Sequence, residues 1–140
     1  LPLMKEIHIF IDLCATGTKQ ERNDKINRLI QGVYSIAMFM IESGIPQAYI
    51  WYDKVNGVIQ EYSVEQEEEL YWMFQELFRS KTTTEESELM EAYVDWGKGR
   101  LLESALYLTV ADHESLDSGN LVRDRLEVMD LRGDVIEDQE

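Results

Sequence analysis

Cysteine and histidine are scarce in this chain of 140 residues, which contains one cysteine and two histidines. A single cysteine excludes an internal disulfide and indicates a reducing compartment, so that a cytoplasmic location is expected. A zinc site is not expected, because zinc in proteins is held mainly by histidine and cysteine side chains. A small domain that is held together by disulfides or by zinc is therefore not expected.

Positively charged residues are also few. The 13 lysines and arginines are outnumbered by 28 aspartates and glutamates, and the net charge is −15. Nucleic acids and anionic membrane surfaces would be repelled, because binding to them depends on basic side chains that displace counterions. No apolar run approaches the roughly 20 residues of a membrane helix, and no signal peptide is recognised. The expected partner is a protein that is basic or that is bridged through a metal.

Length and composition predict a single domain over residues 1–140. The hydrophobic fraction of 44% and the aromatic fraction of 10% suffice for a core without disulfides. No internal repeat or low-complexity linker divides the chain. It begins Leu1-Pro2-Leu3 rather than with methionine, which predicts a domain excised from a longer protein or preceded by vector residues.

Alternating β-rich and helical patterns predict an α/β fold. Expected helices cover 26–40 (with Asn23 or Asp24 as N-cap), 65–79 and 85–96, and expected strands cover 7–14, 48–55, 58–64, 106–111 and 126–131. Asn56-Gly57 predicts a hairpin between the second and third strands. Helical crossovers make the other strands parallel, so we expect a three-layer, doubly wound, mostly parallel sheet with one antiparallel edge strand.

Acidic and hydroxyl side chains follow two of the buried strands. Asp12 ends the first buried run and is followed by Cys14 and Thr16, while Asp112 ends a later one. Ligands of open α/β sheets bind outside the carboxyl ends of the strands, where a hydroxyl-rich loop at 82–84 is also expected. Carboxylate and hydroxyl oxygens suit Mg²⁺.

On these residues the sequence resembles the von Willebrand factor A-like domain, and within it a bacterial group catalogued as domain of unknown function number fifty-eight. The resemblance covers nearly the whole chain. It implies a metal-ion-dependent adhesion site built from Asp-x-Ser-x-Ser, a later threonine and a later aspartate. The matching positions are Asp12, Thr16, Thr84 (with Thr83 as the alternative) and Asp112, and Cys14 stands in place of the first serine.

Cys14 departs from the family pattern in a way that matters chemically. A thiol is a soft ligand that is poorly matched to Mg²⁺ or Ca²⁺. We therefore expect a degenerate site that binds no cofactor, with Mg²⁺ or another divalent cation as the alternative. The family's last helix and strand are not apparent after Leu131. In the purely structural alternative, Asp12 and Asp112 accept hydrogen bonds from backbone N–H groups, and Cys14 is a small buried hydrophobe.

The first two helices carry more apolar residues than a core stripe needs. The additional ones are Tyr34, Met38, Phe39, Tyr71 and Trp72. Packing beneath neighbouring helices is the favoured explanation, and an exposed patch for contact with a partner protein is the alternative.

The leading functional hypothesis is a non-catalytic protein-binding or adaptor module. The resemblance implies such a role and implies that the partner is a MoxR-type AAA+ ATPase. As an enzymatic alternative, Asp12 to Thr16 also looks like a damaged Asp-x-Asp-x-Thr motif of haloacid-dehalogenase-like phosphatases, with Asp12 as nucleophile and Asp112 and Asp117 as Mg²⁺ ligands. A third hypothesis is a structural homodimer that uses the aromatic helix face.

Overall fold

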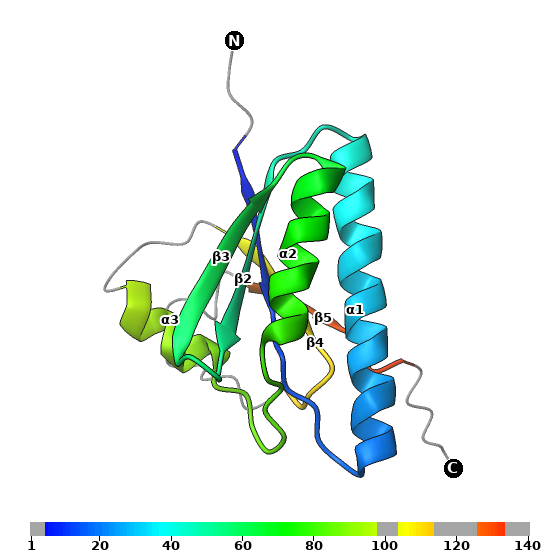
Figure 1. Ribbon diagram of the computed structural model, residues 1–140, viewed down its shortest axis with the longest axis vertical. Coiled ribbons are helices and arrows are strands. Elements are labelled where there is room, and N and C mark those ends of the chain that lie inside the picture. The colour runs from blue at the N-terminus through cyan, green and yellow to red at the C-terminus, as the bar shows by residue number, and fades with distance from the viewer. Residues whose placement is uncertain (1–4, 98–103, 114–125, 134–140) are drawn as a thin grey trace.

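The computed structural model describes residues 5–97, 104–113 and 126–133. In chain order the elements are β1 (Ile7–Ile11), α1 (Lys19–Glu42), β2 (Gln47–Asp53), β3 (Val58–Val64), α2 (Glu67–Arg79), α3 (Leu89–Gly97), β4 (Ala105–Thr109) and β5 (Leu126–Asp130). The strands form one sheet in the order β3-β2-β1-β4-β5, in which only β2 and β3 pair antiparallel. The predicted α/β fold with one antiparallel edge strand is confirmed (Figure 1).

Helices cover both faces of the sheet and make three layers. Along β1, Ile9 and Ile11 are buried with the apolar residues of α1 and α2, whereas Phe10 is buried on the other face with Leu89 and Tyr93 of α3. Successive side chains of a strand point to opposite faces, so a continuous apolar run is what a doubly covered strand requires. Figure 1 shows α1 and α2 lying side by side over one face of the sheet.

Two helix boundaries differ from the prediction. Helix α1 begins at Lys19, because Thr18 is its N-cap and forms a capping box with Glu21; the expected N-cap at Asn23 or Asp24 was wrong. Helix α3 begins at Leu89 rather than at residue 85. The residues before it are held by tertiary contacts near the end of β1, which an expectation based on local sequence cannot include.

Within the part of the chain that the structure describes, no helix combines the length and the apolar character needed to cross a bilayer. Two expectations concern residues outside the described ones: Asp117 as a Mg²⁺ ligand, and the lack of the family's last helix and strand after Leu131.

Candidate functional site

Asp12 lies directly after β1 and is almost completely buried, with 3% of its surface exposed. Its backbone N–H donates to the carbonyl of Leu108 at 2.9 Å, which extends the pairing with β4 beyond the strand. The carboxylate accepts two hydroxyl hydrogen bonds, from Ser87 Oγ to Oδ1 at 2.7 Å and from Thr109 Oγ1 to Oδ2 at 3.0 Å. Ser87 Oγ also lies 3.2 Å from the hydroxyl of Tyr107.

These contacts correct the structural alternative for Asp12, which expected backbone N–H donors. Side-chain hydroxyls take that role instead, and sequence reasoning missed both donors. Thr109 carried a usable signal, since it is a polar residue inside a buried strand and such groups need a hydrogen-bond partner. Ser87 carried none, because it precedes α3 in a polar loop and lies 75 residues from Asp12 in the sequence.

Burial raises the pKa of the Asp12 carboxyl above its ordinary value, and hydrogen bonds from Ser87, Tyr107 and Thr109 offset only part of that increase. Desolvation disfavours the charged form of an acid, whereas donors directed at the carboxylate favour it. The fold thus holds a carboxylate in a place where its charge is costly. Such an arrangement occurs at functional sites and also in purely structural networks.

The threonine loop pairs with the segment that follows Asp12. Thr83 donates its N–H to the carbonyl of Leu13 at 2.8 Å, and its own carbonyl accepts from Ala15 N–H at 3.0 Å, so that Thr83 and Cys14 form a parallel bridge. The Thr83 hydroxyl is buried and donates to the Leu13 carbonyl at 3.3 Å. Thr84, the position best matched to the family threonine, is exposed. Thr83 is therefore the threonine beside Cys14, and its hydroxyl contacts both the Leu13 carbonyl and the Cys14 thiol.

A pocket of about 470 Å³ opens at this edge of the sheet and brings the two distant aspartates together. It is lined by Asp12, Cys14, Thr16, Glu85, Glu86, Ser87, Met90, Glu91, Ala111, Asp112 and His113. No lysine or arginine of the described residues contributes to the lining, whereas five carboxylates do. The pocket is electronegative, so it suits a cation and opposes an anionic phosphoester.

The donors in this pocket fit a hydrated hard cation better than a fully protein-ligated one. Asp12, Thr16 and Asp112 offer oxygen atoms to the same space, and Mg²⁺ usually keeps several waters while binding one or two carboxylates. Each oxygen of Asp12 already accepts a hydroxyl hydrogen bond, however, and Cys14 offers sulfur. These residues could hold such an ion mainly through water.

Cys14 is fully buried. Burial raises the pKa of its thiol, and the nearby carboxylates of Asp12, Glu88 and Glu86 raise it further, against a lowering by the hydrogen bond with Thr83. Because the thiolate is the reactive species, we expect alkylation by iodoacetamide to be at least about tenfold slower in the folded protein than in the denatured chain. Mass spectrometry of timed samples measures both rates. Equal rates would contradict this, because they would show that Cys14 is as accessible and as reactive in the folded protein as in the denatured chain.

A second feature lies on the outer surface of α1 and α2. Of the residues expected to form either a packed or an exposed apolar set, Tyr34, Phe39, Tyr71 and Trp72 are 50–63% exposed. Only Met38 is partly buried against the core, as the favoured explanation required. Packing beneath neighbouring helices was thus wrong for four of the five. Phe78 of α2 is exposed to a similar extent, at 64% of its surface.

Three aromatic rings pack in a row across the junction of α1 and α2, those of Tyr34, Phe74 and Phe78. Together with the exposed Tyr71 on the same side of α2, we call them the aromatic surface. The ring centroids of Tyr34 and Phe74 lie 6.4 Å apart, and those of Phe74 and Phe78 lie 5.5 Å apart. Tyr71 precedes Phe74 by three residues and Phe78 by seven, which places all three on one side of α2. The rings thus join across two helices.

Phe39 does not belong to this surface, although it is on the same helix as Tyr34. It follows Tyr34 by five residues, which is a rotation of about 140° around the helix axis. It follows Gly32 by seven residues, and Gly32 is packed so closely against Leu131 that an added Cβ would lie 2.6 Å from Leu131 Cδ1. Phe39 therefore lies on the same flank of α1 as Gly32, about two turns further along the helix, and not on the flank of Tyr34.

A hollow of about 450 Å³ continues the aromatic surface between the two helices. Its lining includes apolar residues of both helices, Ile26 and Ile30 from α1 with Leu77 and Phe78 from α2, beside Leu13, Asn27, Gln31, Ser80 and Thr82. A concave apolar space beside exposed rings can take an apolar side chain from outside.

Comparison with known proteins gave no match to any family model, curated protein or solved structure. Inference about function therefore rests on the geometry of the acidic pocket and of the aromatic surface.

Proposed function

We propose that this chain is a non-catalytic protein-binding module and that the aromatic surface is where its partner docks. The observation that carries the proposal is the exposure of Tyr34, Tyr71 and Phe78, each at half or more of its surface, on two helices that are joined by the ring contacts of Phe74 with Tyr34 and Phe78. Contiguous apolar patches of this kind mark protein contacts, and aromatic residues are enriched there.

The apolar hollow and the negative charge of the chain indicate which side chains the partner would carry. An apolar or aromatic side chain of the partner would enter the hollow beside Phe78 and would supply most of the binding energy, as buried anchors do. The net charge of −15 favours basic residues around that anchor, because complementary charge speeds association and selects partners. An acidic partner would be repelled.

The resemblance to von Willebrand factor A-like domains supports the same proposal and suggests which partner to test. A mostly parallel sheet with one antiparallel edge strand is what that resemblance implies for the fold, and the two aspartates of the implied adhesion site line one pocket. Fold does not establish function. The MoxR-type AAA+ ATPase is accordingly part of the proposal.

The phosphatase alternative has less support. Both oxygens of Asp12, the required nucleophile, are engaged by hydroxyl groups, and Cys14 takes the place of the general acid. Five carboxylates in the pocket would oppose a phosphorylated substrate unless a metal neutralised them. The homodimer remains the competing use of the aromatic surface, and it differs from the adaptor in the oligomeric state of the isolated chain.

The test is binding of the purified chain to the MoxR-type ATPase of its source organism, measured by biolayer interferometry. Changing Tyr34→Ser together with Phe78→Ser should weaken binding at least about tenfold, because both rings would lie at the centre of the interface. Phe39→Ser is the matched control. It removes an equally exposed ring from the other flank of α1, and its affinity should equal that of the wild type.

Two results would contradict the adaptor role. One is the absence of measurable binding by the wild-type chain; the other is equal loss in the double variant and in Phe39→Ser. Sedimentation velocity on the same samples separates the homodimer. A wild-type dimer that dissociates in the double variant would assign the aromatic surface to self-association.

A further inference from the structure

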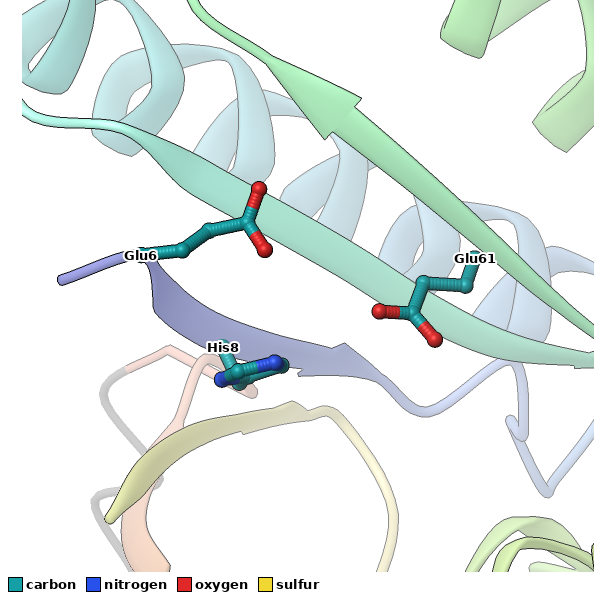
Figure 2. Close-up of side chains that lie close together, drawn as sticks. All are labelled: Glu6, His8 and Glu61. Carbon is teal, nitrogen blue, oxygen red and sulfur yellow. The ribbon is translucent and has the colours of Figure 1, made fainter. Parts of the chain in front are cut away.

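A separate cluster of potential metal ligands lies at the amino end of β1, at the opposite end of that strand from Asp12. It consists of Glu6, directly before β1, His8 within β1, and Glu61 within β3. Figure 2 shows the three side chains gathered over the sheet, with β2 running between the strands that carry them. One ligand atom from each residue lies within 4.8 Å of the other two.

The register of the sheet explains why these residues meet. Glu6 and His8 are two positions apart, so they project from the same face of the sheet. His8 pairs with Ala48 of β2, and Ala48 pairs with Ser63 of β3. Glu61 is two positions from Ser63 and pairs with Ile50, so it projects from the same face and lies diagonally across Ala48 from His8. The small methyl side chain of Ala48 leaves room above β2 for His8 and Glu61 to approach each other.

The donor set favours a transition-metal ion over Mg²⁺ or Ca²⁺. One imidazole nitrogen and two carboxylate groups suit Zn²⁺ and similar divalent ions, whereas Mg²⁺ and Ca²⁺ prefer oxygen alone. Metal–ligand distances of about 2.0–2.2 Å with tetrahedral angles put ligand atoms about 3.3 Å apart. Side-chain rotations that move atoms by about an ångström are therefore enough to close the set.

Two other features favour binding. The Ser63 hydroxyl donates to Glu6 Oε2 at 2.8 Å, which orients that carboxylate in the way that outer hydrogen bonds orient metal ligands. All three residues are half-buried, so an ion can reach them from solvent while the strands hold their backbones. An ion here would also neutralise two carboxylates that lie close together in a chain of strongly negative charge.

We propose that Glu6, His8 and Glu61 bind one divalent transition-metal ion, with Zn²⁺ as the best match, and that the ion joins β1 to the edge strand β3 across β2. Three protein ligands leave a fourth position for water. The site is independent of the aromatic surface and of the Asp12 pocket. It stabilises the folded chain by mass action, because the unfolded chain does not hold the three ligands together.

Isothermal titration of the full chain with ZnCl₂ tests the proposal in a Cys14→Ala background, which removes the single thiol and adds no oxygen ligand to the Asp12 pocket. We expect one ion per chain, with affinity at least about tenfold weaker in His8→Gln and in Glu61→Gln. Both substitutions nearly keep side-chain size, and circular dichroism without metal checks that each variant folds. Zn²⁺ should raise the midpoint of thermal unfolding in the parent and not in His8→Gln.

His113→Gln is the matched control, because His113 is the other histidine and lies at the Asp12 pocket. It should leave Zn²⁺ affinity unchanged. Loss of binding in His113→Gln with retention in His8→Gln would overturn the proposal, as would the absence of saturable binding to the parent. Displacement of Zn²⁺ by a tenfold excess of Mg²⁺ would also overturn it, because it would indicate unspecific attraction to acidic residues.

Discussion

Replacing Trp51 with alanine should lower the free energy of unfolding by about 3–5 kcal/mol, the range for truncating a large buried aromatic side chain. Trp51 lies on β2 and is completely buried. Its ring stacks on Tyr62 of β3 with centroids 5.2 Å apart, and its indole N–H donates to Ser80 Oγ, directly after α2, at 2.8 Å. One side chain thereby connects two strands and the end of a helix.

Urea denaturation followed by circular dichroism measures this loss, and Trp72→Ala is the matched control. Trp72 is 58% exposed on α2, so its removal should change the free energy of unfolding by no more than about 0.5 kcal/mol. Trp51→Phe should fall between the two, because it keeps most of the buried area and loses the hydrogen bond to Ser80. Similar losses in Trp51→Ala and Trp72→Ala would mean that α2 does not cover β2 as described.

Replacing Asp12 with alanine should cost about 2 kcal/mol or more, because two hydroxyl donors lose a charged acceptor in a buried setting. Ser87 and Thr109 both direct their hydroxyl groups at this carboxylate. Asp12→Asn keeps an oxygen acceptor and removes the charge, so it should cost much less. Chemical denaturation at neutral pH compares the two. Equal losses would show that the charge, and not the hydrogen-bond network, stabilises this end of the sheet.

Comparing the wild type with Asp12→Asn also gives a pH dependence, whose sign follows from the raised pKa of Asp12, which burial causes. The folded state then binds the proton more tightly than the unfolded state, whose aspartate has the ordinary pKa of 3.8. The stabilisation that follows from the raised pKa of Asp12 is therefore complete below about pH 3.8 and is lost as pH rises through the folded-state pKa. The Asp12→Asn variant has no such loss, because its amide does not titrate.

Subtracting the wild-type free energy of unfolding from that of Asp12→Asn isolates this contribution, because the other titrating groups are shared. The difference should shift in favour of Asp12→Asn as pH rises from acid to neutral. A difference that moves the other way would mean that the hydrogen bonds from Ser87 and Thr109 outweigh the desolvation of the carboxylate.

The Asp12 pocket, the aromatic surface and the cluster of Glu6, His8 and Glu61 could be predicted from the sequence to different degrees. Asp12 and Asp112 could be placed at one edge from strand patterns alone, because the carboxyl ends of parallel strands share an edge. The exposure of Tyr34 and Phe78 could not be predicted in this way. Apolar residues at helical spacing indicate which side of a helix is buried, but not how much of that side the neighbouring elements cover. The low count of histidine and cysteine argues against zinc, and such a count cannot register that the sheet brings Glu61 close to His8.

Local capping was a different case. The N-cap of α1 is encoded locally by Thr18-x-x-Glu21, a capping box, although Asn23 and Asp24 just after it are also typical N-cap residues. The start of α3 was not readable, because Ser87, two residues before it, is engaged by Asp12.

By itself, the sequence determined the order of strands and helices, the parallel sheet with its hairpin edge strand, and the position of an acid after β1. These depend on periodicity, burial of apolar runs and turn residues, which are properties of short segments. Only the tertiary structure decided that Ser87 and Thr109 bind Asp12, that four rings share one surface, and that Glu61 meets His8. Those contacts join residues far apart in the chain, and they depend on strand register and on how completely one layer covers the next.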